Sequence, residues 1–87
     1  MKTIFKYYLP VSVPFTLAMP QGATILVAQN QAEAVVIWAE VDPELPLESR
    51  TFVTAMTGQP LPRGKKQFLG TVQLAGGALV FHVYEML

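Results

Sequence analysis

The fold class of this chain is decided by the stretch Gln67–Glu85, which reads Gln-Phe-Leu-Gly-Thr-Val-Gln-Leu-Ala-Gly-Gly-Ala-Leu-Val-Phe-His-Val-Tyr-Glu. Two runs rich in β-branched and aromatic residues flank the pair Gly76-Gly77. Glycine readily takes the positive φ that a tight hairpin turn requires. We therefore expect Lys66–Leu74 and Ala78–Met86 to form an antiparallel hairpin.

Short apolar segments separated by turn residues continue along the rest of the chain. This pattern is typical of strands, and it predicts them at Thr3–Leu9, Phe15–Met19, Ala23–Ala28, Ala34–Val41 and Thr51–Thr57. Asn30 and Gln31 would form the polar tip of a hairpin. The sequence thus predicts one all-β domain over residues 1–87, a small antiparallel sandwich or barrel of about six to seven strands with at most a short helical turn.

Two segments need separate treatment. Ala34–Val41 is almost continuously apolar, which predicts a central strand covered on both faces; a buried helix is the alternative, and its β-branched residues disfavour it. In Asp42–Arg50, Pro43 and Pro46 argue against a regular strand. Asp42 could instead cap a single helical turn that starts at Pro43.

The composition carries more apolar material than a small domain easily hides. Of 87 residues, 52% are hydrophobic and 14% are charged, against a usual charged share of about 25%. We expect some of this surface to be buried in a homo-oligomer or against a partner. The alternative is a compact monomer filled by its aromatic side chains.

Charge and hydropathy exclude several classes of protein. The formal net charge is zero, which disfavours binding to long nucleic acids. Pro10, Pro14 and Pro20 interrupt the apolar N-terminal region, so it makes a poor signal peptide, and no segment approaches the about 20 apolar residues of a membrane span. The absence of cysteine fits a reducing, cytoplasmic compartment.

The chain offers little for catalysis. His82 is its single histidine, and a lone histidine among apolar neighbours is usually a half-buried structural residue. The carboxylates near Asp42 lack the glycine and the ligand spacing of a calcium loop, and an ordinary solvated loop, in which Glu48 or Asp42 could pair with Arg50, is the better interpretation. We expect no enzyme, no metal and no cofactor.

Arg63-Gly64-Lys65-Lys66 is the single basic cluster in the sequence. A glycine-containing backbone beside lysine and arginine can hold a phosphate, although the spacing is not that of a P-loop. A solvated turn between strands is the plainer interpretation. Large aromatics such as Trp38 and Tyr84 would mostly be core, but one at a boundary could stack on a nucleobase.

Taken together, several segments resemble a family of small uncharacterised proteins of bacteriophages and prophages. The resemblance is carried by Met1–Tyr7, Met19–Leu26, Val41–Pro43, Thr57-Gly58, Gly70–Gln73 and Gly76–Glu85. It brings no activity and no catalytic residues. What it implies is a setting, because small phage genes often encode proteins that bind components of host defence.

Three function classes follow. The first is a non-catalytic counter-defence protein that sequesters a small nucleotide-like signal in the host cytoplasm, at a pocket or subunit boundary. The second is an inhibitor that binds a host defence protein, and the third is a structural or assembly component of the virion. For the first class the predicted ligand-binding residues are Arg50, Arg63, Lys65 and Lys66 for phosphate, with Trp38, His82 and Tyr84 for stacking or orientation.

Overall fold

The computed structural model describes residues 1–11 and 14–87, and its regular structure is almost entirely extended. A short 3-10 turn, η1 (Ala75–Gly77), joins the last two strands. The all-β prediction is confirmed. The strands are β1 (Thr3–Leu9), β2 (Pro14–Pro20), β3 (Thr24–Gln31), β4 (Ala34–Val41), β5 (Leu47–Met56), β6 (Lys66–Leu74) and β7 (Leu79–Met86).

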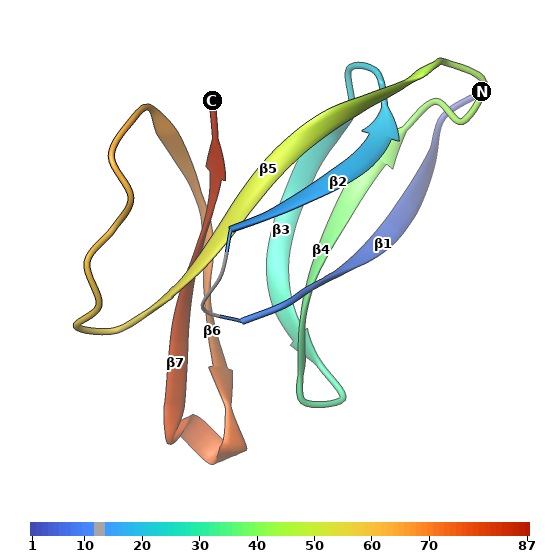
Figure 1. The fold of residues 1–87 in the computed structure, drawn as a ribbon. Helices are drawn as coiled ribbons and strands as arrows, with labels where there is room; N and C mark the ends of the chain where they lie inside the picture. The colour runs from blue at the N-terminus through green and yellow to red at the C-terminus, as the bar shows by residue number, and fades with distance from the viewer. Residues whose placement is uncertain (12–13) are drawn as a thin grey trace.

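These strands form two antiparallel sheets (Figure 1). Sheet A has three strands in the order β1-β4-β3, and sheet B has four in the order β2-β5-β7-β6. The sheets lie closest to each other where β3 runs beside β6. They remain two sheets and do not close into a barrel, so the sandwich is the correct alternative.

The hairpin at Gly76-Gly77 forms as expected. Leu74 pairs with Leu79 across the turn, and Gly76 and Gly77 both take positive φ angles, of 64° and 95°. The amide of Ala78 donates to the carbonyl oxygen of Ala75 at 3.1 Å and closes the turn. Glycine thus supplies the backbone conformation that an L side chain would strain.

Both predictions for Asp42–Arg50 are corrected by the structure, which has a tight turn in place of the helical turn and a strand from Leu47 onward. Asp42 caps a tight turn: its carbonyl oxygen accepts from Leu45 N at 3.1 Å and its Oδ1 accepts from Glu44 N, also at 3.1 Å. No helical turn forms here. After Pro46 the chain becomes strand at once, because Leu47–Arg50 pairs with Leu17–Pro20 of β2.

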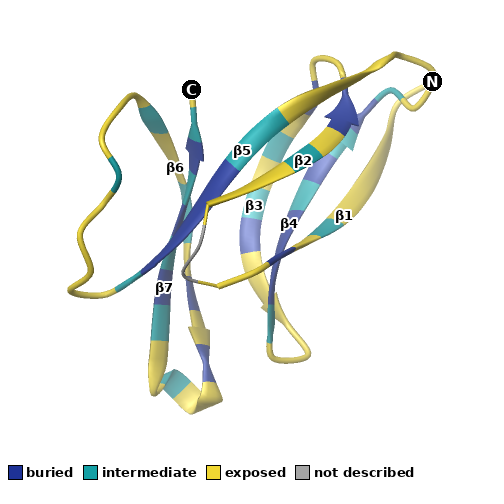
Figure 2. Ribbon diagram, viewed as in Figure 1, coloured by how far each residue is buried: buried dark blue, intermediate teal, exposed yellow. Residues whose placement is uncertain are grey.

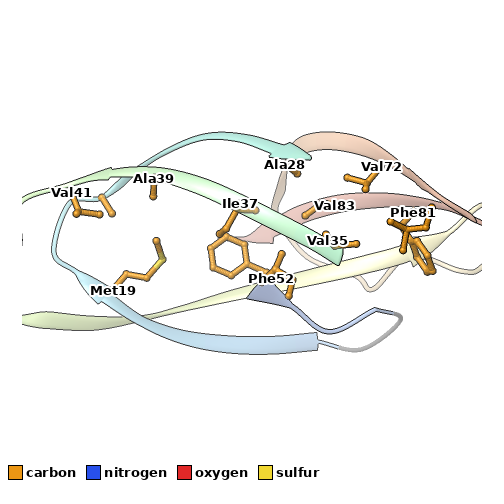
Figure 3. Close-up of a cluster of buried hydrophobic side chains, with 13 residues drawn as sticks. Met19, Ala28, Val35, Ile37, Ala39, Val41, Phe52, Val72, Phe81 and Val83 are labelled. Atoms are coloured by element: carbon orange, nitrogen blue, oxygen red, sulfur yellow. The ribbon is translucent and has the colours of Figure 1, made fainter. Parts of the chain in front are cut away.

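The core lies between the sheets (Figures 2 and 3). From β4, every second residue points inward and is buried, namely Val35, Ile37, Ala39 and Val41. Strands β5, β7 and β2 of sheet B supply the opposing side chains, including Phe52, Phe81, Val83 and Met19. Val36, on the other face of β4, is also fully buried. The central position predicted for Ala34–Val41 is therefore confirmed.

The seam between β3 and β6 is held by a close backbone approach and by a polar cluster. A Cβ on Gly70 would lie 3.1 Å from the carbonyl oxygen of Ala28, so only glycine fits there without a shift. At the hairpin tips, Asn30 Nδ2 donates to Gln73 O at 2.7 Å and Ala75 N donates to Glu33 Oε1 at 2.7 Å. These contacts tie one sheet to the other.

The exposed surface of the chain, 5214 Å², is close to the about 5,100 Å² of a compact monomer of this mass. Its amount therefore gives no sign of a missing partner, and the distribution of apolar side chains matters instead. Among the described residues no helix is long and apolar enough to cross a membrane.

Candidate functional site

The outer face of sheet B carries a row of side chains that we call the aromatic strip: His82 and Tyr84 from β7 with Phe68 and Lys66 from β6. Phe68 pairs with Tyr84 in the ladder, and the two rings meet edge to face with centroids 5.4 Å apart. Phe68 is 53% exposed. An aromatic edge and face are thus available to solvent.

Strand periodicity assembles the strip. Alternate residues of a strand share a face, and successive residues on one face lie about 7 Å apart. His82 and Tyr84 therefore point outward while Glu85 points inward, and Lys66, opposite Met86, extends the row by one step beyond Phe68. The register shifts between Phe68 and Gly70, a bulge after which Thr71 faces His82.

A hollow lies beside the strip, where the segment after β5 folds against the sheet. We call it the loop groove; its volume is about 290 Å³, and it is lined by Ala55, Met56, Thr57, Gly58, Gln59, Leu61, His82 and Tyr84. A second hollow, of about 320 Å³, shares Ala55, Gln59 and Leu61 with the first and is further lined by Pro14, Val53, Thr54, Pro60 and Pro62. No carboxylate lines either one.

The loop groove has a fixed base. Gln59 N donates to Met56 O at 2.9 Å, and Gln59 Oε1 accepts from Met56 N at 2.9 Å. Thr57 N donates to Val80 O of β7 at 3.1 Å. The start of the loop is therefore anchored to the end of β5 and to β7.

His82 forms the polar end of the strip. Its Nε2 lies 2.7 Å from Thr57 Oγ1 and its Nδ1 lies 3.0 Å from Thr71 Oγ1. Both ring nitrogens are thus hydrogen-bonded, as the structural interpretation of this histidine expects, and the ring also lines the groove. Within residues 1–11 and 14–87 no group of three potential metal ligands comes together.

The basic turn, Arg63–Lys66, packs at the opposite end of the strip. A Cβ on Gly64 would lie 3.6 Å from Met86 Cε, in ordinary contact, and Lys66 Nζ donates to Gly64 O at 2.9 Å. Leu87 N donates to Lys65 O at 2.9 Å. Arg63 and Lys65 are exposed. The backbone of the turn is therefore held beyond the aromatic pair, and the side chains of Arg63 and Lys65 extend from it into solvent.

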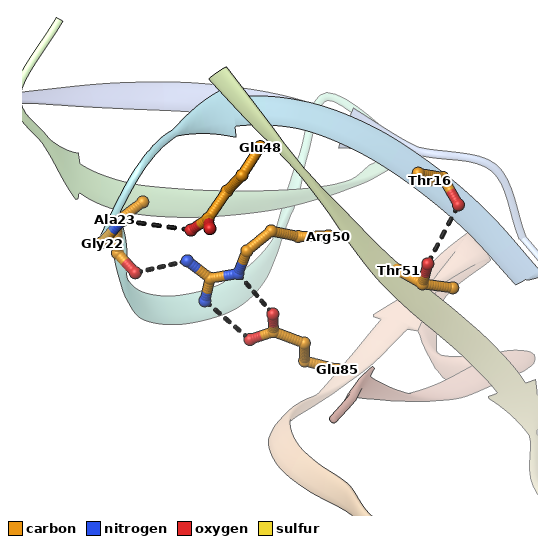
Figure 4. Close-up of polar contacts among 7 residues, drawn as sticks. All are labelled: Thr16, Gly22, Ala23, Glu48, Arg50, Thr51 and Glu85. Carbon is orange, nitrogen blue, oxygen red and sulfur yellow. Dashed lines mark hydrogen bonds and ion pairs between the residues drawn. The ribbon is translucent and has the colours of Figure 1, made fainter. Parts of the chain in front are cut away.

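Arg50 lies elsewhere, on the inner side of sheet B (Figure 4). Its Nε and Nη2 donate to the two carboxylate oxygens of Glu85 at 2.5 and 2.9 Å, and its Nη1 donates to Ala23 O at 2.6 Å. The pKa of Arg50 is raised above its ordinary value, chiefly by the hydrogen bond to Glu85. The partner is thus not Glu48 or Asp42; Glu48 instead accepts from Gly22 N.

Trp38 lies on the outer face of sheet A, away from the strip. Its Nε1 donates to Gln29 Oε1 at 3.0 Å. Of the residues predicted from sequence, the structure brings His82, Tyr84 and the basic turn to one face and leaves Trp38 and Arg50 outside it. Phe68 is a site residue that the sequence does not predict, because counting outward from the Gly76-Gly77 turn places Leu69 opposite Tyr84, and the bulge puts Phe68 there instead.

Comparison with known proteins gives one match. The family model described as a domain of unknown function (DUF7352) matches residues 1–87, the whole length of the chain. No curated protein and no solved structure matches it.

Proposed function

Because the chain belongs to the DUF7352 family, a domain family of unknown function, we propose a function from its own geometry. The protein is a non-catalytic binding protein for a small aromatic anion, with a nucleotide as the best fit. The ligand lies along the aromatic strip of sheet B, and the loop groove receives part of it.

One observation carries this proposal: an exposed aromatic pair stands between a hollow and a cluster of cations. Phe68 and Tyr84 offer a base a surface for stacking, which contributes about 1–3 kcal/mol per base. One step along the ladder, Lys66 begins the basic turn. A planar ring on the aromatic pair would place a phosphate substituent toward these charges.

The charge distribution fits a compact ligand. The chain has no net charge, so it lacks the extended positive surface that long nucleic acids need. A single phosphate needs only two or three donors, and the basic turn offers Arg63, Lys65 and Lys66. With no carboxylate lining the hollows beside the strip, nothing there repels an anion.

Binding rather than catalysis suits the side chains present. The imidazole of His82 is held by two threonine hydroxyl groups, which orients it as a polar wall of the groove. The setting that we propose, interference with a bacterial host defence during phage infection, comes from the resemblance to phage and prophage proteins and not from the groove.

Calorimetric titration with a panel of cyclic nucleotides and NAD-derived signals tests this function. We expect micromolar binding by at least one, weakened about 5- to 150-fold by Phe68→Ala, since one stacked base is lost, and weakened less, with a smaller salt dependence, by Lys66→Gln. Tyr8→Ala and Lys2→Gln, both on exposed positions of the N-terminal segment, are matched controls.

Two results would count against the proposal. If no member of the panel binds at micromolar affinity, and a pull-down from host lysate recovers one stoichiometric protein, the protein acts as an inhibitor of that protein instead. If a compound binds but Tyr8→Ala weakens it as much as Phe68→Ala does, the ligand does not lie on the aromatic strip.

A further inference from the structure

Strand β1 is an edge with an unpaired backbone. All seven of its residues, Thr3–Leu9, pair with β4 on one side in an unbroken register. Among the described residues β4 is the one element that β1 runs alongside. Its other side therefore presents a row of free amide and carbonyl groups, which is a template for a further strand.

The other three edges carry the features that normally prevent such pairing. The edges of β3 and β6 face each other, and both strands contain a bulge, after Ile25 and after Phe68. Strand β2 begins at Pro14 and ends at Pro20. Strand β1 has neither proline nor bulge, so it is the one regular, uncovered edge among these four.

The lysine of β1 does not guard this edge. Lys6 Nζ donates to Gln31 Oε1 of β3 at 2.6 Å, which takes the side chain across β4 to the far strand of sheet A. Lys6 Nζ also lies 4.9 Å from the ring centroid of Tyr8 and 5.9 Å from the ring centroid of Trp38. A charge that would repel an approaching strand is thus drawn away from the edge.

Apolar side chains on both faces of β1 are exposed beside the free backbone. Ile4 and Tyr8 on the outer face are 57% and 58% exposed, and Phe5 on the inner face is 38% exposed. We propose that β1 is an interface with a second copy of this chain. The two β1 strands pair antiparallel about a twofold axis and join two three-stranded sheets into one of six strands.

Side-chain matching favours a second copy as the occupant. A twofold axis at Phe5 sets Ile4 opposite Lys6 and Thr3 opposite Tyr7 of the other copy, and an axis at Tyr7 sets Lys6 opposite the Tyr8 ring. Neither register sets two like charges opposite each other. An axis at Lys6 would oppose two lysines and is disfavoured. The strand is therefore self-complementary in two of its three central registers.

The interface would be small. One strand of seven residues buries less than the about 1,200 Å² of a standard stable interface, and the monomer already has an ordinary exposed surface. We therefore expect a dimer that dissociates at low concentration, independent of any ligand on sheet B.

Sedimentation velocity over about 1–200 μM tests the interface in the range expected for weak complexes. The mass should rise toward twice 9.6 kDa as concentration increases. The double variant Ile4→Lys/Tyr8→Lys replaces the two exposed outer-face apolar side chains of the edge by charged ones and should raise the dissociation constant at least tenfold. Leu26→Lys/Leu79→Lys, at two similarly exposed leucines on other strands, should leave it unchanged.

Because the chain contains no cysteine, single cysteines report the register. A short bismaleimide should link Phe5→Cys or Tyr7→Cys into a covalent dimer and leave Ala18→Cys, on the β2 edge, monomeric. A monomer of 9.6 kDa throughout the range would overturn the proposal. So would a dimer that Ile4→Lys/Tyr8→Lys does not weaken, or equal cross-linking at Ala18→Cys.

Discussion

Removing Glu85 is the most informative perturbation of the fold. The Arg50 and Glu85 side chains are only 18% and 6% exposed, and Glu85 accepts two of the three hydrogen bonds that the guanidinium donates. In Glu85→Leu the charge of Arg50 stays inside, with the Ala23 carbonyl as its one remaining hydrogen-bond partner and Glu48 as a neighbouring charge. Breaking a buried pair in this way costs about 3–5 kcal/mol.

That loss is large for this chain. At the usual about 0.05–0.15 kcal/mol per residue, a domain of 87 residues has a free energy of unfolding of about 4–13 kcal/mol. Glu85→Leu should therefore leave it marginally folded at 25 °C. Urea unfolding followed by the fluorescence of Trp38, the single tryptophan, measures the change.

The double variant Arg50→Met/Glu85→Leu is the control. Replacing both partners by apolar side chains removes the stranded charge, so it should cost about 1 kcal/mol, chiefly for the lost bond to Ala23 O. The reasoning is refuted if Glu85→Leu costs less than about 1 kcal/mol, as for a surface pair. It is refuted equally if the double variant costs the sum of the two single ones.

Three further changes probe the turns and the seam. Gly77→Val should lower the midpoint of thermal unfolding more than an ordinary surface substitution does, because φ is 95° at this position. An unchanged midpoint would mean that the turn does not need this glycine. Gly70→Ala, whose Cβ would lie 3.1 Å from Ala28 O, should destabilise by about 1–3 kcal/mol in urea unfolding, and a neutral result would mean that the seam adjusts. The pKa of Glu33 is lowered from 4.5, chiefly by the hydrogen bond from Asn30 and then by that from the Ala75 amide. The contribution of Glu33 to stability is therefore fully present above pH 4.5 and is lost as the pH falls through the lower pKa of the folded state. In Glu33→Gln the unfolding midpoint should fall less steeply as the pH is lowered, and an unchanged pH dependence would contradict this.

Strand positions were predictable because their signals are local. Thr3–Leu9, Ala34–Val41 and Lys66–Leu74 begin and end where the sequence predicts, since alternation of side chains and turn residues acts within a few positions. Leu47–Arg50 was not predictable in this way. Its strand depends on pairing with β2, a contact between segments far apart in the chain that outweighs the neighbouring Pro46.

The residues of the candidate site likewise fall into two groups, those placed by local signals and those placed by contacts between segments far apart in the chain. That His82 and Tyr84 share a face follows from the period of two. The Gly-Gly turn alone would set Leu69 opposite Tyr84, and only the bulge after Phe68 brings Phe68 there instead. The partner of Arg50 could not be read from the chain, because it requires the register of β5 on β7, in which Phe52 faces Glu85. Trp38 has the side chain of a stacking residue, and only the order of the strands, which puts β4 in sheet A, separates it from the site.

The binding account is tested most directly by amide and indole chemical shifts of the isotope-labelled protein during titration with the tightest-binding nucleotide of the panel. The account predicts shifts that gather at Thr57–Gln59, Arg63–Phe68 and His82–Tyr84, while the Trp38 indole resonance, on the other sheet, stays in place. Shifts centred on Trp38 and β1, or none at millimolar ligand, would contradict it.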